Sequence, residues 1–214
     1  MNLGYVLSLC DRTGKMVEPW ANAGYTCYCV DIQHTTITHK VVGNGIIYFI
    51  PGDVLTYVLP AVRFAAAFAF TPCTDLAVSG ARWFKDKGAR RLVEALDLFV
   101  RCMELCEATG APYFVENPVS VAATHLRRPD YSFHPCEYAG YLENPNDEAY
   151  TKKTCLWAGG RFIMPDRKPV EPILGSKMHL LPPSDDRADL RSETPTGFAR
   201  AVFLANSRVL ADAA

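Results

Sequence analysis

The sequence predicts an α/β fold built on a doubly wound, mainly parallel sheet. Short apolar runs that suit buried strands alternate along the first half of the chain with segments of helical periodicity. The longest of these segments, residues 87–109, places apolar side chains at helical spacing. Several strand-like runs are followed at once by a polar residue, as the Tyr25–Val30 run is followed by Asp31. This pattern indicates a sheet whose carboxyl edge carries ligand-facing loops.

The first half of the chain contains five predicted strands and two predicted helices. The first helix follows Gly14 and ends at Gly24, a residue type that readily adopts the left-handed conformation that closes many helices. Gly110 is expected to end the long second helix in the same way. The strands are expected at Tyr5–Leu9, Tyr25–Val30, Ile46–Ile50, Ala65–Phe70 and Pro112–Val115.

The second half of the chain has weaker periodicity. Residues 119–150 are rich in proline, aromatic and polar residues, with one candidate strand near Tyr131–Tyr138 and a further strand at Thr154–Trp157. The proline-rich stretch from Pro165 to Pro183 favours a long irregular loop, and Thr194-Pro195 opens a final helix. We therefore divide the chain into an α/β domain over residues 1–160, an irregular loop over 161–190 and a C-terminal helix over 191–214 that packs back on the domain.

The bulk composition is that of an ordinary globular protein. The chain has 214 residues, of which 49% are hydrophobic and 21% charged, with a formal net charge of −1, and this balance argues against wholesale disorder. Arg63 interrupts even the apolar stretch from Leu59 to Phe70, so no run is long enough to cross a membrane. The N-terminus lacks the basic segment and cleavage site of a signal peptide, and a cytoplasmic protein is expected.

Eight cysteines raise the question of a disulfide framework or a zinc site. Cys27 and Cys29 alternate along a predicted strand, and Cys102 and Cys106 lie one helical turn apart. These spacings fit neither kind of site, so we expect reduced, mostly buried thiols and no metal.

Three loops after predicted strands carry candidate binding residues. Ser8–Gly14 is a strand-to-helix turn, which brings backbone amides and a helix N-terminus close to a ligand. Asp31 ends the second strand, where an acidic residue commonly holds ribose hydroxyls, and Asp53 follows the third strand, where it could accept a hydrogen bond from an adenine amino group. Each aspartate is about as well explained, taken singly, as an ordinary turn or capping residue.

Two further strand ends carry reactive groups. Thr71-Pro72-Cys73 follows the Ala65–Phe70 strand, and Val115-Glu116-Asn117-Pro118 ends the next one. A thiol nucleophile and a carboxylic acid at neighbouring strand ends suit attack on an electron-poor ring whose nitrogen must be protonated. The simpler interpretation of Cys73 is a buried structural thiol, but its position after a proline in a polar loop favours chemistry.

The order of these motifs resembles that of the DNA cytosine-5 methyltransferases, and it is similar to that of a group of small phage-encoded relatives of the family. The resemblance covers most of residues 5–118 and implies a Rossmann-like fold that binds S-adenosylmethionine. It rests, in order, on Leu7–Gly14, Val30-Asp31, Gly52-Asp53-Val54, Pro72-Cys73 with Gly80 seven residues on, and Phe114-Val115-Glu116-Asn117.

The resemblance implies a mechanism. Cys73 is the implied nucleophile that adds to carbon 6 of cytosine, and Glu116 is the acid that holds and protonates the ring nitrogen, so that carbon 5 can take the methyl group. Lys152 and Lys153 stand where the family has a basic pair that touches the target base or its phosphates. On this basis we assign Lys153 to catalysis and Lys152 to nucleic acid.

The same resemblance assigns further residues to ligands. The implied cofactor-binding residues are Asp11, Arg12, Thr13, Gly14, Asp31, Ile32, Asp53, Val54, Thr71 and Pro72. The implied nucleic-acid-binding residues are Ser79, Arg82, Lys85 and Asn117, together with Lys152. The basic residues near Arg82 and Lys85 could equally form a solvated face.

The chain departs from the family pattern at several positions. Arg12 replaces a glycine that is usual in the cofactor loop, and Pro118 replaces an aliphatic residue. Ala77 replaces a serine common four residues after the nucleophile, although Ser79 is close by. The Arg191–Pro195 segment resembles a late arginine-threonine-proline motif of the family, or else the helix after it stands in for the last motif near the cofactor.

The largest departure is a missing target-recognition domain. Only residues 162–190 remain where family members insert it, which is too little for an independent domain. Reading several base pairs requires side chains on a rigid element. Short or relaxed sequence specificity, single-stranded substrates, a partner protein or a mononucleotide substrate would each suit such a chain.

The leading hypothesis is a compact S-adenosylmethionine-dependent cytosine-5 methyltransferase that acts on duplex or single-stranded DNA in a bacterial or phage-infected cell. One alternative is modification of a free pyrimidine nucleotide. The other is a non-catalytic remnant that binds DNA or cofactor and acts through partners. The sequence leaves the target site and the oligomeric state open.

Overall fold

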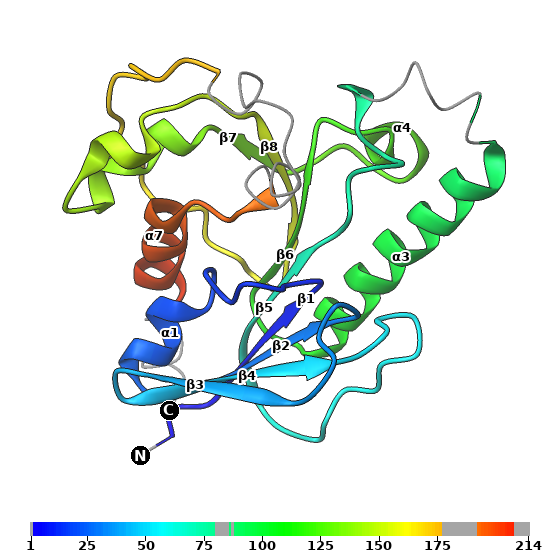
Figure 1. Ribbon diagram of the computed structural model, residues 1–214, viewed down its shortest axis with the longest axis horizontal. Helices are drawn as coiled ribbons and strands as arrows, with labels where there is room; N and C mark the ends of the chain where they lie inside the picture. Colours follow the sequence, from blue (N-terminus) through cyan, green and yellow to red (C-terminus); the bar gives the residue numbers. More distant parts are fainter. Residues whose placement is uncertain (1, 80–85, 87, 177–191, 208–214) are drawn as a thin grey trace.

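A mixed sheet of eight strands runs through the computed structural model, which describes residues 2–79, 86, 88–176 and 192–207 (Figure 1). In spatial order the strands are β3 (Thr38–Val42), β4 (Gly45–Pro51), β2 (Thr26–Asp31), β1 (Tyr5–Leu9), β5 (Phe64–Phe70), β6 (Tyr113–Pro118), β8 (Thr154–Gly159) and β7 (Tyr131–Phe133). The five strands predicted in the first half of the chain all form, four of them within one residue of their expected bounds, whereas β6 extends three residues beyond the expected end at Val115.

The centre of the sheet agrees with the predicted parallel arrangement, but its borders do not. The strands β4, β2, β1, β5 and β6 run parallel to one another. In contrast, β3 is antiparallel to β4, β8 to β6, and β7 to β8. The expectation of a parallel sheet is thus correct for five neighbouring strands and wrong for the three at the borders.

The antiparallel strand β3 was absent from the predicted elements. It joins β4 through Gly43 and Asn44, a connection too short for the crossover that a parallel pair needs. Gly43 has φ +56°, and a side chain there would collide with the backbone of Asn22. Four of the five residues of β3 are exposed, so it lacks the apolar pattern that reveals a strand.

The order of the strands reverses beside β1. From β1 the chain adds β2 and then β4 on one side, and it then crosses to the other side to add β5 and β6. Ligands of open α/β sheets bind at such a switch point, outside the carboxyl ends of the strands. The loops after β1 and β5 border this point, and they contain Asp11 and Cys73 respectively.

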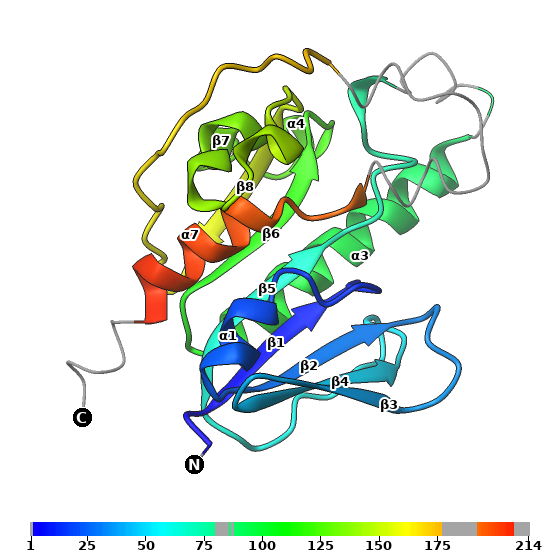
Figure 2. The same cartoon turned by 60° about the vertical axis from the view of Figure 1, so that its left-hand side comes forward.

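Helices cover both faces of the sheet (Figures 1 and 2). On one face, α1 (Glu18–Ala23) and α7 (Thr196–Asn206) contact each other and bury Trp20, Phe198 and Val202. On the other face, α3 (Ala89–Ala108) buries Phe99 and Cys102 against β5 and β6. The two predicted long helices are confirmed at 89–108 and 196–206, and the short first helix begins later than Gly14.

The second half of the chain adds short elements to this frame. After β6 come α4 (Ala122–His125), β7 and three 3₁₀ helices at Pro135–Glu137, Ala139–Tyr141 and Pro145–Glu148. The candidate strand near residues 131–138 is therefore only three residues long, because the chain turns into a 3₁₀ helix at Pro135. Residues 160–176 contain no helix or strand, as expected for the start of the proline-rich loop. The division into three regions stays a prediction.

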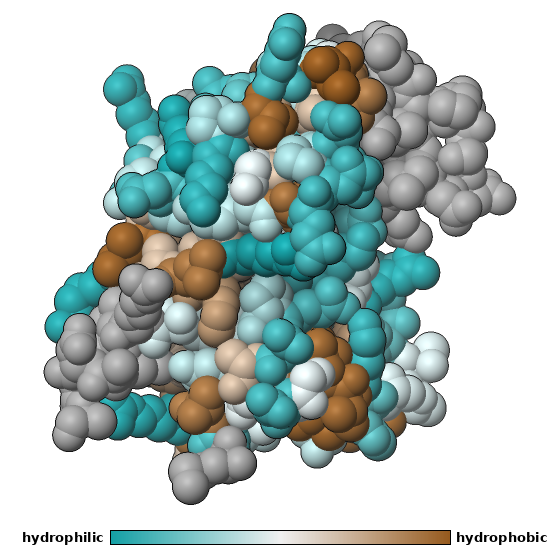
Figure 3. Space-filling model, turned by 90° about the vertical axis from the view of Figure 1, so that its left-hand side faces the viewer, coloured by the Kyte–Doolittle hydropathy of each residue, from teal (hydrophilic) through white to brown (hydrophobic). Residues whose placement is uncertain are grey.

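The surface on the side of α1 and α7 is mostly hydrophilic, with separate smaller hydrophobic patches (Figure 3). Within the described part of the chain, no helix combines the length and the apolar character that crossing a membrane would need.

Candidate active site

Asp11 organises the loop that follows β1. The side chain is 4% exposed, and its Oδ1 accepts hydrogen bonds from the backbone amides of Gly14 at 2.7 Å and Thr13 at 3.0 Å. Its Oδ2 accepts a hydrogen bond from Ser8 Oγ at 2.7 Å. The carboxylate of Asp11 therefore holds the loop in shape through hydrogen bonds within it.

Other residues of this loop are exposed or have an uncommon backbone conformation. Gly14 has φ +69°, and a Cβ there would come within 3.1 Å of the Phe49 ring, so glycine suits the tight turn. Arg12 and Thr13 are exposed at the tip of the loop. Cys10 also adopts a left-handed conformation, with φ +52°, which is uncommon for a residue with a side chain and clusters at functional sites.

Asp31 and Asp53 lie on the β2 and β4 side of the switch point. Asp31 is the last residue of β2, and Asp53 lies just after β4. Asp31 is 6% exposed and accepts a hydrogen bond from the amide of Gln33 at 2.8 Å. Asp53 is exposed and accepts one from the amide of Leu55 at 3.0 Å. Both aspartates thus form turns through one oxygen, which is the simpler of the two roles expected for them, and each has a second oxygen that a ligand could use.

The hydrophobic neighbours of these two aspartates differ from each other. Ile32, directly after Asp31, is 75% exposed and offers an apolar surface beside the carboxylate. Val54, directly after Asp53, is 3% exposed and packs in the core. A ligand can therefore contact the Ile32 side chain, whereas at residue 54 only the backbone is available.

Asn117 and Thr71 tie the carboxyl ends of β5 and β6 together. The Asn117 Nδ2 donates hydrogen bonds to the carbonyl oxygen and to Oγ1 of Thr71, both at 3.0 Å. Thr71 Oγ1 in turn donates to the carbonyl oxygen of Glu116 at 3.2 Å. Asn117 is fully buried and its Oδ1 has no hydrogen-bond partner, so in this conformation it positions the strand ends and does not present its side chain to nucleic acid.

Backbone hydrogen bonds anchor the described start of the loop that carries Cys73, residues 71–79. The carbonyl oxygen of Cys73 accepts hydrogen bonds from the amides of Leu76 at 3.1 Å and Ala77 at 2.8 Å, which makes one helical turn. Ala77 then pairs with Ser120 in a small antiparallel bridge to the segment after β6. This arrangement places Cys73 on a turn fixed at both ends, next to the exposed Pro72.

Exposure separates Cys73 from the other cysteines. All eight cysteines lie in the described residues and none is in a disulfide, and Cys73 alone is exposed. Burial raises the pKa of thiols such as Cys29 and Cys106, which keeps them protonated and unreactive. Of the eight thiols, Cys73 is therefore the one with the access that a nucleophile requires.

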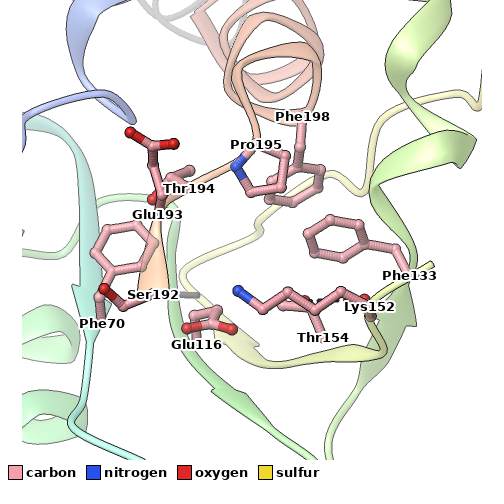
Figure 4. A pocket seen from close by; sticks show the side chains of 10 residues that line it. All are labelled: Phe70, Glu116, Phe133, Lys152, Thr154, Ser192, Glu193, Thr194, Pro195 and Phe198. Carbon is pink, nitrogen blue, oxygen red and sulfur yellow. Dashed lines mark hydrogen bonds between the residues drawn. The ribbon is translucent and has the colours of Figure 1, made fainter. Parts of the chain in front are cut away.

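Glu116 faces a small pocket at the carboxyl end of β6 (Figure 4). Burial raises the pKa of the Glu116 carboxyl above its ordinary value, and the charge of Lys152 acts in the opposite direction. A raised pKa favours a carboxyl group that keeps its proton and can donate it. The residues that line the pocket are Phe70, Glu116, Phe133, Lys152, Thr154, Ser192, Glu193, Thr194, Pro195 and Phe198.

The pocket is narrow and has aromatic walls. Phe133 and Phe198 stack with their ring centroids 3.9 Å apart, and Phe70 lies on another side (Figure 4). The free space is about 10 Å³, which is close to the room that one water molecule needs. A pyrimidine ring could enter only if the wall moved outward.

The two lysines before β8 point to different places. Lys152 lines the pocket with its ammonium toward Glu116, whereas Lys153 is exposed (Figure 4). Burial raises the pKa of the Cys155 thiol, and the charge of Lys153 acts in the opposite direction. The structure thus brings Lys152, and not the expected Lys153, into the vicinity of the candidate acid.

Some site residues were missed in the sequence, and others cannot be placed. Phe133 and Phe198 line the pocket but come from segments far apart in the sequence, so the sequence did not indicate them as site residues. The nearest sequence signal was the Thr194-Pro195 motif close to Phe198. Ser79 is exposed on the Cys73 loop, where it could meet a ligand. Arg82 and Lys85 lie outside the described residues.

Comparison with known proteins gives only distant structural likenesses. No protein-family model matches the chain, and no curated protein matches it. Among solved structures, it is similar to an E. coli protein described as a DNA modification methyltransferase encoded within a prophage, with a TM-score of 0.43 and 12% identity. The match covers 72% of this chain and 46% of that chain. The chain thus spans less than half of the length of that protein.

Proposed function

We propose that this protein transfers a methyl group from S-adenosylmethionine to carbon 5 of cytosine in DNA. The observation that carries the proposal is the joint position of Cys73 and Glu116. The exposed thiol follows β5 and the carboxyl group with a raised pKa lies near the end of the neighbouring parallel strand β6, on one side of the switch point of the sheet. The hydrogen bonds between Thr71 and Asn117 fix these two strand ends relative to each other.

The residues of the β1 and β2 loops fit the proposed cofactor, which supplies an electrophilic methyl group. Asp31 retains one carboxylate oxygen for ribose hydroxyls, and the exposed Ile32 offers an apolar surface for a flat ring. Arg12 is exposed on the β1 loop and suits a carboxylate group. Asp11 and Gly14 set the path of the backbone that these groups share.

The chemistry begins at Cys73. Its thiolate adds to carbon 6 of the cytosine ring and forms a carbon–sulfur bond, while Glu116 gives its proton to ring nitrogen 3. The electron pair of the ring bond between carbons 5 and 6 moves to carbon 5, which would bond to the methyl group while the bond from that group to the sulfonium sulfur of the donor breaks and S-adenosylhomocysteine leaves with the electron pair. Loss of the proton from carbon 5 to a base then expels the thiolate and restores the ring, and nitrogen 3 returns its proton to Glu116.

Lys152 and the aromatic residues give the pocket its affinity for a polar, flat ring. The Lys152 ammonium lies on the pocket wall beside Glu116, where it can donate a hydrogen bond to a carbonyl oxygen of the base. Phe70 and Phe133 offer faces for stacking. Lys153, on the outside, is placed better for a phosphate than for the base.

A base in duplex DNA must leave the stack to enter this pocket, at a cost of a few kcal/mol. With no separate recognition domain in the sequence, few groups offset that cost, so we expect short or relaxed sequence specificity and good activity on single strands. We also propose that this activity takes place in the cytoplasm of a bacterial or phage-infected cell.

Transfer of label from methyl-labelled S-adenosylmethionine tests the proposal. Purified protein is incubated with duplex DNA, single-stranded DNA or dCMP, and the bases are then separated. We expect label at carbon 5 of cytosine in DNA, and Cys73→Ser should reduce the rate by about a thousandfold or more. The matched control is Cys136→Ser, at a buried cysteine outside the pocket, which should keep most of the activity.

Each other outcome has a clear consequence. If wild-type protein labels neither DNA nor dCMP, or if Cys73→Ser keeps full activity, the proposed mechanism is wrong. If only dCMP is labelled, the chemistry stands and the substrate is the free nucleotide.

A further inference from the structure

An ion pair joins the candidate cofactor loop to the wall of the Glu116 pocket. The Lys15 ammonium contacts the carboxylate of Glu193, and the two side chains are 37% and 39% exposed. Lys15 directly follows Gly14, and Glu193 is one of the residues that line the pocket. Two regions that lie 178 positions apart in the sequence are therefore connected by one contact.

The two ends of this contact are fixed to different parts of the site. On the loop side, the amide of Lys15 donates a hydrogen bond to Thr13 Oγ1 at 3.3 Å, so Lys15 follows the position of the Asp11–Gly14 turn. On the pocket side, Glu193 immediately precedes Thr194 and Pro195, which also line the pocket. In Figure 4 the Glu193 carboxylate points out of the pocket toward the N-terminal part of the chain, drawn in blue.

The segment after Glu193 is held on its other side by Glu148. The Glu148 carboxylate is 9% exposed and accepts hydrogen bonds from the amides of Thr196 and Gly197, the latter at 3.0 Å. A Cβ at Gly197 would lie 2.5 Å from the carbonyl oxygen of Tyr138, which shows how closely the start of α7 packs there. The pocket wall at residues 193–195 thus lies between an anchor at Glu148 and a link to Lys15.

The charge of Lys15 also reaches the Glu148 anchor. Burial raises the pKa of Glu148, and the hydrogen bonds from Gly197 and Thr196 together with the charge of Lys15 act in the opposite direction. Displacement of Lys15 therefore changes the electrostatic environment of both carboxylates that hold the pocket wall.

We propose that Lys15 and Glu193 are positioning residues that couple ligand binding at the β1 loop to the closure of the Glu116 pocket. This inference rests on the proposed function, because it takes the β1 loop as the binding site of the methyl donor. The coupling has a physical purpose, since the pocket must widen for a base to enter and narrow again around it. It is also modest, because exposed ion pairs are weak.

Hydrogen exchange with S-adenosylhomocysteine as the only ligand tests this coupling. The probe is the peptide that contains the amides of Thr196 and Gly197, followed with and without saturating ligand. We expect the ligand to slow exchange there by about two- to fivefold in wild-type protein. Glu193→Gln and Lys15→Met should each abolish this protection, and the double variant should lose no more than either single one.

A second ion pair of the same kind provides the matched control. Lys40 Nζ lies 2.7 Å from Glu18 Oε1, between β3 and α1, and is similarly exposed. Lys40→Met should keep the protection of the probe peptide. A separate thermal melt of each variant confirms that it is folded, which is expected for changes at a surface pair.

The outcomes separate this inference from the proposed function. If wild-type protein binds S-adenosylhomocysteine without protection of the probe peptide, or if Glu193→Gln keeps the protection, the coupling is wrong and the proposed function stands. If wild-type protein does not bind the ligand at all, both proposals fall together.

Discussion

The two sides of the switch point use their acidic residues in different ways. On the β1, β2 and β4 side, Asp11, Asp31 and Asp53 all accept hydrogen bonds from backbone amides in their own loops. On the β5 and β6 side, Glu116 faces a pocket with Lys152, and its pKa is raised by burial. On the β1, β2 and β4 side, the carboxylates shape their own loops through hydrogen bonds. On the β5 and β6 side, the Glu116 carboxyl group is available for the proposed proton transfer.

This difference has a thermodynamic consequence. A charged carboxylate that accepts amide hydrogen bonds stabilises the folded state, and its removal leaves buried donors without partners. A carboxyl group whose pKa is raised by burial does the reverse, because the folded state prefers its protonated form and stability falls as the pH rises toward the folded pKa. Variants on the two sides should therefore change different observables, namely stability on one side and activity on the other.

The largest expected effect comes from Glu116→Gln. The amide cannot give a proton to the ring nitrogen, so we expect methyl transfer to fall by about a hundred- to ten-thousandfold. The same change removes a group that burial disfavours when charged, so the free energy of unfolding at neutral pH should stay the same or rise. Steady-state kinetics and urea denaturation of the same preparation measure the two quantities.

A matched control and a contrary result define this test. Glu107→Gln, at an exposed position near the end of α3, should change neither activity nor stability. A Glu116→Gln protein that keeps wild-type activity would remove Glu116 from the chemistry and would break the contrast between the two sides.

Asp11→Ala should show the opposite pattern. It removes a buried carboxylate that accepts two amide hydrogen bonds and one from Ser8 Oγ, so we expect the free energy of unfolding to fall by about 2–4 kcal/mol. Affinity for S-adenosylhomocysteine should also fall, because the loop loses its shape. Urea denaturation and calorimetry check the two effects.

The comparison depends on Asp11 acting through the fold. If Asp11→Ala is as stable as wild type and yet fails to bind the ligand, Asp11 contacts the cofactor itself, and the first side of the site is less structural than its hydrogen bonds indicate.

Lys152→Met tests the electrostatics of the pocket. The charge of Lys152 lowers the pKa of Glu116 against the effect of burial, so its removal should raise that pKa further. Because the reaction needs protonated Glu116, the alkaline limb of the kcat/KM profile should move to higher pH. Lys153→Met is the matched control, since Lys153 is exposed and its charge acts on Cys155 instead. An equal shift in both variants would contradict the separate placement of the two lysines.

The sequence predicted the parallel centre of the sheet better than its borders, and there are physical reasons for this. A buried strand such as β5 is a short run of consecutive apolar residues, which is a recognisable pattern in the sequence. The strand β3 is mostly exposed and has no such pattern. The order of loops along the chain was enough to place Cys73 and Glu116 at the carboxyl ends of two neighbouring strands, because parallel strands have their carboxyl ends at one edge.

The pocket itself was beyond sequence reasoning. Whether Lys152 or Lys153 faces Glu116 depends on the phase of the chain as it enters β8, and adjacent side chains there point to opposite sides. Phe133 belongs to β7 and Phe198 to α7, and only the folded chain brings their two rings together. Asn117 belonged to a motif that implied contact with DNA, but burial gives it the role of a tie to Thr71.

Asp53→Asn is the smallest and most discriminating change. One oxygen of Asp53 accepts the amide of Leu55, and asparagine keeps an acceptor for that turn, so stability should change by less than about 0.5 kcal/mol. The other oxygen becomes an NH₂ group, which cannot accept a hydrogen bond from an adenine amino group. If Asp53 holds the cofactor, the Kd for S-adenosylhomocysteine measured by calorimetry should therefore rise by about two- to tenfold. Asp53→Ala, which also loses the turn, should weaken binding at least as much. If Asp53→Asn binds like wild type while Asp53→Ala binds weakly, Asp53 serves the turn alone and acts, like Asp11, through the shape of its loop.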